Sequence, residues 1–184
     1  MSVVYLVAIG IVPPQVLDWV ENTLAEWTPW PVQRFPSMVF PEGAYDANRG
    51  QHKSVELMKL LARSAPTDAA RMIGVTEGDL AIPTLTFVFG QAQLDGPVAV
   101  ISLARLRQEF YALPADETAL HERVTKEVLH ELGHTFGLTH CADAKCVMSL
   151  ATHIGLVDNK EERYCAQCGE QIAGKISSPD RGTL

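Results

Sequence analysis

Residues 130–140 read His-Glu-Leu-Gly-His-Thr-Phe-Gly-Leu-Thr-His, and this stretch predicts both a helix and a metal site. Residues four apart on an α-helix lie on the same face, so His130 and His134 can aim imidazole nitrogens at one ion. Glu131 is rotated by about 100° around the helix from His130, which suits it to hold a metal-bound water rather than the metal. A lone His-x-x-x-His pair is usually a surface or core feature, so the prediction depends on the longer string.

Gly137 and His140 complete the predicted metal site. Glycine takes a positive φ at no steric cost, so Gly137 can end the helix and turn the chain sharply. The turn brings His140 back as a third ligand. Three protein nitrogens leave the fourth zinc position open for water, which is typical of a catalytic zinc site.

The four cysteines of the chain predict a second metal site. They form two closely spaced pairs, Cys141 with Cys146 and Cys165 with Cys168. Two such pairs separated by a loop are the pattern of a closed, tetrahedral structural zinc site. Disulfides and a redox Cys-x-x-Cys are the alternatives. A reducing compartment disfavours the first, and the second lacks its usual βαβ context.

The combined pattern resembles the metzincin zinc proteases, whose histidine motif is followed by a methionine turn. Met148, eight residues after His140, is the candidate for that methionine, although a methionine taken alone is more often core filler. The cysteines around Met148 make the chain similar to the archaemetzincins in particular. Residues 74–80 and 87–92 also look like that family.

The resemblance implies a zinc-dependent metallopeptidase with one catalytic and one structural zinc, and it assigns no substrate. In the implied mechanism, Glu131 acts as general base on a zinc-bound water. A catalytically weak or inactive zinc-stabilised peptide-binding module is the alternative function. The implied fold is α+β and zincin-like: a twisted mixed sheet packed on the active-site helix, with a small C-terminal subdomain that holds the structural zinc. We place the N-terminal subdomain at 1–137 and the C-terminal subdomain at 138–184.

Hydrophobic patterning predicts alternating strands and helices before the metal helix. Apolar runs predict strands at 3–9, 32–35, 72–75, 85–89 and 98–102, and helical spacing predicts helices at 14–27 and 54–64. The metal helix is expected to run from Asp116, as its N-cap, to Phe136. Residues 36–52 are interpreted as loop and 176–184 as a frayed tail.

An edge strand beside the active-site helix binds the peptide by strand addition in folds of this type. The predicted strand from Leu85 to Gly90 is our candidate, which makes the substrate-binding residues Phe87, Val88, Phe89 and Gly90. A plain core strand fits the same pattern equally well.

The other histidines and Tyr164 are interpreted as structural or exposed. His153 and Tyr164 follow the methionine segment and can in principle reach the cleft, but a single polar side chain in a loop is weak evidence. His121 lies about two and a half turns before His130, so it points to the opposite side of the helix. His52 receives the same structural interpretation.

The composition excludes some classes of partner. A net charge of −7 argues against nucleic-acid binding, because phosphate recognition needs clustered Lys and Arg. No apolar run is long enough to span a bilayer, and the apolar segment 1–12 lacks the basic start and cleavage site of a signal peptide. We therefore expect a cytoplasmic protein, monomeric by default at this size, whose partner is a peptide or protein substrate.

Overall fold

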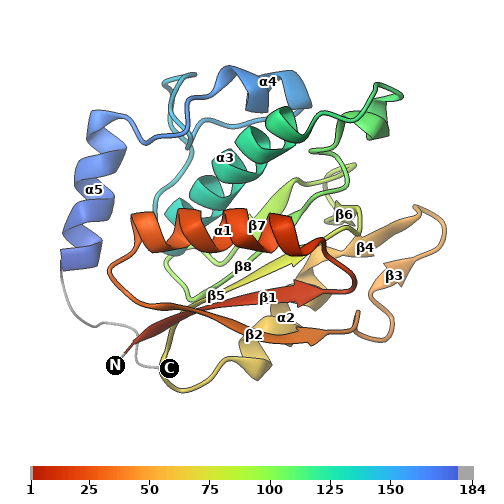
Figure 1. Ribbon diagram of the computed structural model, residues 1–184, viewed down its shortest axis with the longest axis horizontal. Helices are drawn as coiled ribbons and strands as arrows, with labels where there is room; N and C mark the ends of the chain where they lie inside the picture. Colours follow the sequence, from red (N-terminus) through yellow and green to blue (C-terminus); the bar gives the residue numbers. More distant parts are fainter. Residues whose placement is uncertain (1, 178–184) are drawn as a thin grey trace.

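The computed structural model describes residues 2–177, and within them five strands form the main sheet. These strands follow the order β2-β1-β5-β8-β7. Their bounds are β1 Val3–Ile9, β2 Val32–Met38, β5 Ala69–Thr76, β7 Gly90–Ala92 and β8 Val98–Ser102. Neighbours pair in parallel except β7, which runs antiparallel to β8. The sheet is therefore mixed, and β7 forms one of its two edges (Figure 1).

A small second sheet adjoins the main one. It has the order β3-β4-β6, with β3 at Tyr45–Asp46, β4 at Gln51–Lys53 and β6 at Leu80–Ala81. β3 and β4 pair antiparallel, whereas β4 and β6 pair in parallel.

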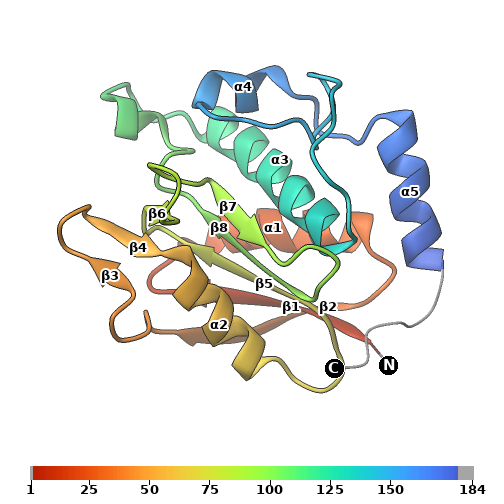
Figure 2. The ribbon, with the colours of Figure 1, turned by 180° about the vertical axis from the view of Figure 1, so that it is seen from behind.

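Helices cover both faces of the main sheet. Helices α1 (Pro14–Trp27) and α3 (Glu117–Thr135) lie on one face, and α2 (Ser54–Ser64) lies on the other (Figures 1 and 2). In β1, Leu6 belongs to the apolar cluster on the α1 and α3 side, whereas Val7 belongs to the cluster on the α2 side. Burial on both faces explains why this strand reads as a continuous apolar run.

Helix α3 begins and ends where its capping residues predict. The Asp116 carboxylate accepts a hydrogen bond of 2.9 Å from the backbone N–H of Ala119, and Gly137 has a φ of +84°. A 3₁₀-helix at Gln108–Tyr111 precedes α3, and α4 (Ile154–Asn159) and α5 (Ala166–Ser177) follow it. Figure 1 shows α4 beside the start of α3. No helix within residues 2–177 is both long enough and apolar enough to cross a membrane.

The prediction of a strand at 85–89 is wrong. A side chain takes the first two carbonyl oxygens of this segment and one just before it: the Arg49 guanidinium donates to Leu85 O and Thr86 O at 2.7 and 2.8 Å, and to Ile82 O at 3.1 Å. Only an isolated bridge from Val88 to Leu80 remains. The edge strand β7 therefore starts at Gly90, where the prediction ends its strand.

The prediction of a continuous loop at 36–52 is also wrong. β2 runs through Pro36 to Met38, and β3 and β4 follow. β2 is an edge strand, where the missing N–H of proline need not cost a ladder hydrogen bond. At the other end of the chain, α4 and α5 were not predicted. Ile176 and Ser177 belong to α5 rather than to a frayed tail, and 178–184 lie outside the described residues.

The N-cap of α3 gives a test of this local structure. Replacing Asp116 with Ala removes the acceptor for the Ala119 N–H. We expect the free energy of unfolding to fall by about 1 kcal/mol, measured by urea denaturation at fixed zinc concentration. Glu122→Ala, at an exposed position of the same helix, is the control. An equal loss in both variants would contradict the capping role.

Candidate active site

His130 and His134 lie one turn apart on α3, and a backbone carbonyl orients each ring. The Nδ1 of His130 is 2.9 Å from Val147 O, and the Nδ1 of His134 is 2.7 Å from Leu138 O. A carbonyl oxygen only accepts hydrogen bonds, so each Nδ1 carries a proton. In a neutral imidazole the other nitrogen is then bare. The two Nε2 atoms lie 3.1 Å apart.

Two bare nitrogens at this distance point their lone pairs at a common space, and a cation between them relieves the repulsion. A tetrahedral zinc with Zn–N bonds of about 2.0–2.1 Å separates its nitrogens by roughly 3.4 Å, close to the spacing here. His140 joins the group, since one nitrogen of each of the three histidines lies within 4.8 Å of the others. Burial, followed by the positive charge of Lys160, lowers the pKa of His130 well below its usual value, so the ring is neutral as a ligand requires.

Met148 lies beneath the two histidines. A Cβ added at Gly133, between the histidines on α3, would overlap the Met148 Sδ. Met148 is fully buried and belongs to a tight turn, in which the Ser149 N–H donates to Cys146 O at 2.9 Å. The residue predicted for the methionine turn therefore supports the helix at the level of the metal group.

Glu131 has a buried carboxylate that faces the sheet edge. Its Oε2 is buried without a hydrogen-bond partner among residues 2–177. A Cβ at Gly90 would lie 2.6 Å from the other oxygen, Oε1, so the first residue of β7 is in close contact with this side chain. Burial, followed by the charge of Glu127, raises the pKa of Glu131 well above its usual value.

The four residues predicted to bind substrate differ in how deeply they are buried and in what they contact. Gly90 approaches Glu131, as described. Phe89 is 5% exposed and belongs to the core on the α3 side, whereas Val88 is half-buried and bridges to Leu80. Phe87 is also half-buried, and its ring lies 4.2 Å from the guanidinium carbon of Arg105.

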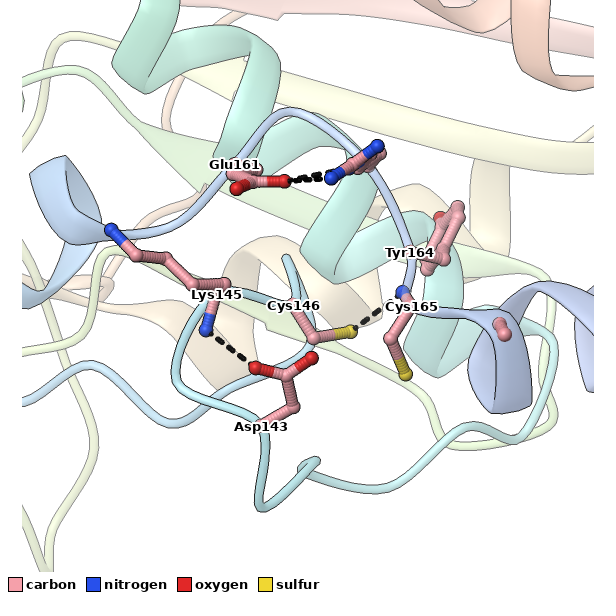
Figure 3. Close-up of a pocket in the computed structure, with 8 residues that line it drawn as sticks. Asp143, Lys145, Cys146, Glu161, Tyr164 and Cys165 are labelled. Carbon is pink, nitrogen blue, oxygen red and sulfur yellow. Dashed lines mark hydrogen bonds and ion pairs between the residues drawn. The ribbon is translucent and has the colours of Figure 1, made fainter.

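The four cysteines converge on a second point. Their sulfur atoms all lie within 4.8 Å of one another, and those of Cys141 and Cys165 are 3.8 Å apart. A tetrahedral zinc with Zn–S bonds of about 2.3 Å separates its sulfurs by roughly 3.8 Å, whereas a disulfide needs about 2.05 Å. All four are free thiols, so the disulfide alternative does not hold. Figure 3 shows Cys146 and Cys165 side by side, with the Cys165 N–H donating to the Cys146 Sγ at 3.3 Å.

The remaining histidines and Tyr164 lie in structural or exposed positions. His121 is exposed with its ring 4.7 Å from that of Trp19, and His52 stacks on Phe40 at 4.0 Å. His153 is exposed. Tyr164 is buried, and its hydroxyl donates to Leu129 O at 2.7 Å, so it braces α3.

Sequence reasoning missed two buried charges behind the histidines. The Lys160 Nζ lies 3.4 Å from His130 Nδ1 and 3.9 Å from the Glu127 Oε1. Glu127 precedes Glu131 by four residues, so helical spacing alone predicts that the two carboxylates lie on the same face of the helix. Lys160 gave none, because it is 30 residues from His130 in the chain.

Comparison with known proteins identifies the family. The sequence model of peptidase family M54 matches residues 42–174. The chain belongs to this family. It is 47% identical over 137 residues to the archaemetzincin of Methanocaldococcus jannaschii, a match that covers 74% of each chain. It is 36% identical over 187 residues to the archaemetzincin of Pyrococcus abyssi, covering 96% of this chain and 97% of the relative.

Solved archaemetzincin structures share the fold. The crystal structure from Methanopyrus kandleri superposes with a TM-score of 0.84 at 37% identity and covers 96% of both chains. The structure from Archaeoglobus fulgidus, complexed with malonate, gives 0.79 at 31% identity and covers 92% of this chain and 99% of that one. These matches confirm the predicted α+β metzincin-like fold. This member of family M54 is a zinc metallopeptidase, and its three-histidine and four-cysteine groups can hold two zinc ions.

The two groups predict the metal content. Wild-type protein should bind about two zinc ions per chain, and His134→Ala about one, because each group holds its own ion. Metal analysis after dialysis measures this. A mild chelator should remove the ion of the open three-histidine group first. Two ions retained by His134→Ala would contradict the assignment.

Proposed function

We propose that Glu131 is the general base of peptide-bond hydrolysis at a zinc ion held by His130, His134 and His140. The observation that carries the proposal is the pair of bare Nε2 atoms 3.1 Å apart, next to a carboxylate with a buried, unpartnered oxygen within the described chain. A buried polar atom without a partner is rare in a protein interior and often marks a catalytic role. Peptides are the substrate class of this enzyme family.

When bound, zinc supplies a Lewis acid that polarises a peptide carbonyl and acidifies water. Glu131 accepts a proton from the attacking water and passes it to the leaving amine. Its Oε2 makes no hydrogen bond within residues 2–177, which leaves that atom free to hold the proton. The contact with Gly90 limits where the carboxylate can move.

We propose that the peptide binds along β7. Phe89 O accepts from the Ser102 N–H, and the Gln93 N–H donates to Val98 O, so alternate residues of this segment face β8. The residues between them, Gly90 and Ala92, then turn their backbone groups to the free edge, where a peptide can add as a strand. Phe87 and Val88 would flank the peptide, while Phe89 anchors the strand in the core.

We also propose that residues from 138 onward act as one C-terminal unit. This unit carries His140, Met148 and a structural zinc held by Cys141, Cys146, Cys165 and Cys168. Cys141 follows His140 directly, and its N–H donates to Met148 O at 2.9 Å. The structural zinc would therefore fix the third histidine and the methionine turn together.

Replacing Glu131 tests the catalytic proposal. Glu131→Gln keeps the shape of the side chain but cannot accept the proton. We expect peptide turnover to fall roughly 10²–10⁴-fold at unchanged zinc content, measured on a peptide library by mass spectrometry. Glu122→Gln, exposed on the same helix, is the matched control. Equal cleavage by wild type and Glu131→Gln would refute the proposal. Peptide binding by both without turnover by either would favour the peptide-binding module instead.

The contact between Gly90 and Glu131 gives a second test. In Gly90→Ala the new Cβ would lie 2.6–2.8 Å from three atoms of the Glu131 side chain and push the carboxylate aside. A displacement of about 1 Å at a reacting group can cost roughly 10²-fold, so we expect kcat to fall by that order. Gly174→Ala is the control, because a Cβ there meets nothing within 4 Å. Unchanged kcat in Gly90→Ala would show that this contact does not position Glu131.

A further inference from the structure

Lys160 is a buried lysine that the proposed chemistry does not use. It follows α4, and its side chain is 1% exposed. Its Nζ lies 3.4 Å from the Nδ1 of His130, the ring nitrogen opposite the one that faces His134. A positive charge therefore sits directly behind the first histidine of the metal group.

This contact is unfavourable when His130 holds a metal. The Nδ1 carries the proton that it donates to Val147 O at 2.9 Å, and an ammonium group has only donors. Neither group can accept a hydrogen bond from the other. A cation on the far side of the same ring adds repulsion, which is strong because the surroundings are buried. An unopposed ammonium here would weaken metal binding.

Glu127 supplies the opposing charge. It lies on α3 three residues before His130, and its Oε1 is 3.9 Å from the Lys160 Nζ. The Glu127 side chain is 3% exposed, so water screens this pair little. Lys126, the neighbouring base on α3, is directed elsewhere, since its Nζ donates to Asp158 O at 3.4 Å.

The backbone around Lys160 connects the pair to the groups that orient His130. The Glu161 N–H donates to Lys145 O at 2.8 Å, and the Val147 N–H donates to Arg163 O at 3.0 Å. Two residues that follow Lys160 are thus paired with the segment that carries the Val147 carbonyl.

We propose that Glu127 is a positioning residue for the catalytic metal, because its buried carboxylate oxygen, which makes no hydrogen bond within residues 2–177, lies 3.9 Å from the Lys160 ammonium and offsets its charge behind His130. The proposal rests on the proposed function, since it takes His130 as a metal ligand. It assigns Glu127 a role distinct from that of Glu131, one turn further along the same helix.

A purely structural charge pair would behave differently. Losing either partner would leave one buried charge alone and destabilise the fold in both cases. The proposed role instead predicts different effects of the two single variants on metal affinity. Glu127→Gln removes the largest of the negative charges that act on Lys160, ahead of Glu131, and so leaves more positive charge beside the metal ligand. Lys160→Met instead leaves a negative charge, which does not repel a cation. The double variant removes both charges.

Cobalt(II) titration of the metal-free full-length protein separates these cases. The four-cysteine site gives thiolate-to-cobalt charge transfer together with its own d–d bands, and this pair of signals also reports the folding of the C-terminal segment. The d–d absorption that rises without further charge transfer reports the three-histidine site. We expect Glu127→Gln to raise the Kd of the three-histidine site for cobalt about tenfold. Losses of this size are typical when a residue that supports a metal ligand from behind is replaced. Lys160→Met should not raise it, and the double variant should return to within about threefold of wild type.

Equal weakening by the two single variants, or a double variant no better than Glu127→Gln, would overturn the charge role. If Glu127→Gln also loses the thiolate signal, the double variant decides: a restored three-histidine spectrum supports the proposal and an absent one overturns it. A wild-type protein without the three-histidine spectrum would refute the proposed function itself, an outcome distinct from the others.

Discussion

Two unprotonated imidazole nitrogens held 3.1 Å apart are the constraint on which this structure depends. The carbonyls of Val147 and Leu138 fix the tautomer of each ring, so that both lone pairs point at the same space. A positive charge between the two nitrogens relieves the repulsion of their lone pairs. The three-histidine group can therefore hold a cation, and His140 brings a third nitrogen within 4.8 Å of the other two.

The elements around this centre are connected by hydrogen bonds that link distant parts of the chain. The Asp95 N–H, in the turn between β7 and β8, donates to His134 O at 3.0 Å and so ties the sheet edge to the end of α3. The Tyr164 hydroxyl braces α3 from the other side through Leu129 O. The edge strand, the ligand helix and the segment that carries the cysteines thus converge on one site, an arrangement that supports the proposal of a peptide on β7 and a general base at Glu131.

Short-range spacing made much of the site predictable. The histidines and Glu131 lie within 11 residues, and the caps Asp116 and Gly137 mark the helix ends by their own chemistry. Long-range partners were not predictable. Arg49 binds the carbonyls of Ile82, Leu85 and Thr86, where the apolar pattern predicts a strand from Leu85. Lys160 contacts His130 from 30 residues away in the chain. The apolar pattern of a segment does not show which distant side chain will take its hydrogen bonds.

Anomalous diffraction at the zinc edge, from crystals of zinc-loaded protein, tests the central claim most directly. The account predicts a peak about 2.0–2.1 Å from one nitrogen each of His130, His134 and His140, and a second peak about 2.3 Å from the four cysteine sulfurs. A map with no peak among the three histidines, or with the ion bound by Glu131 in place of one of them, would contradict it.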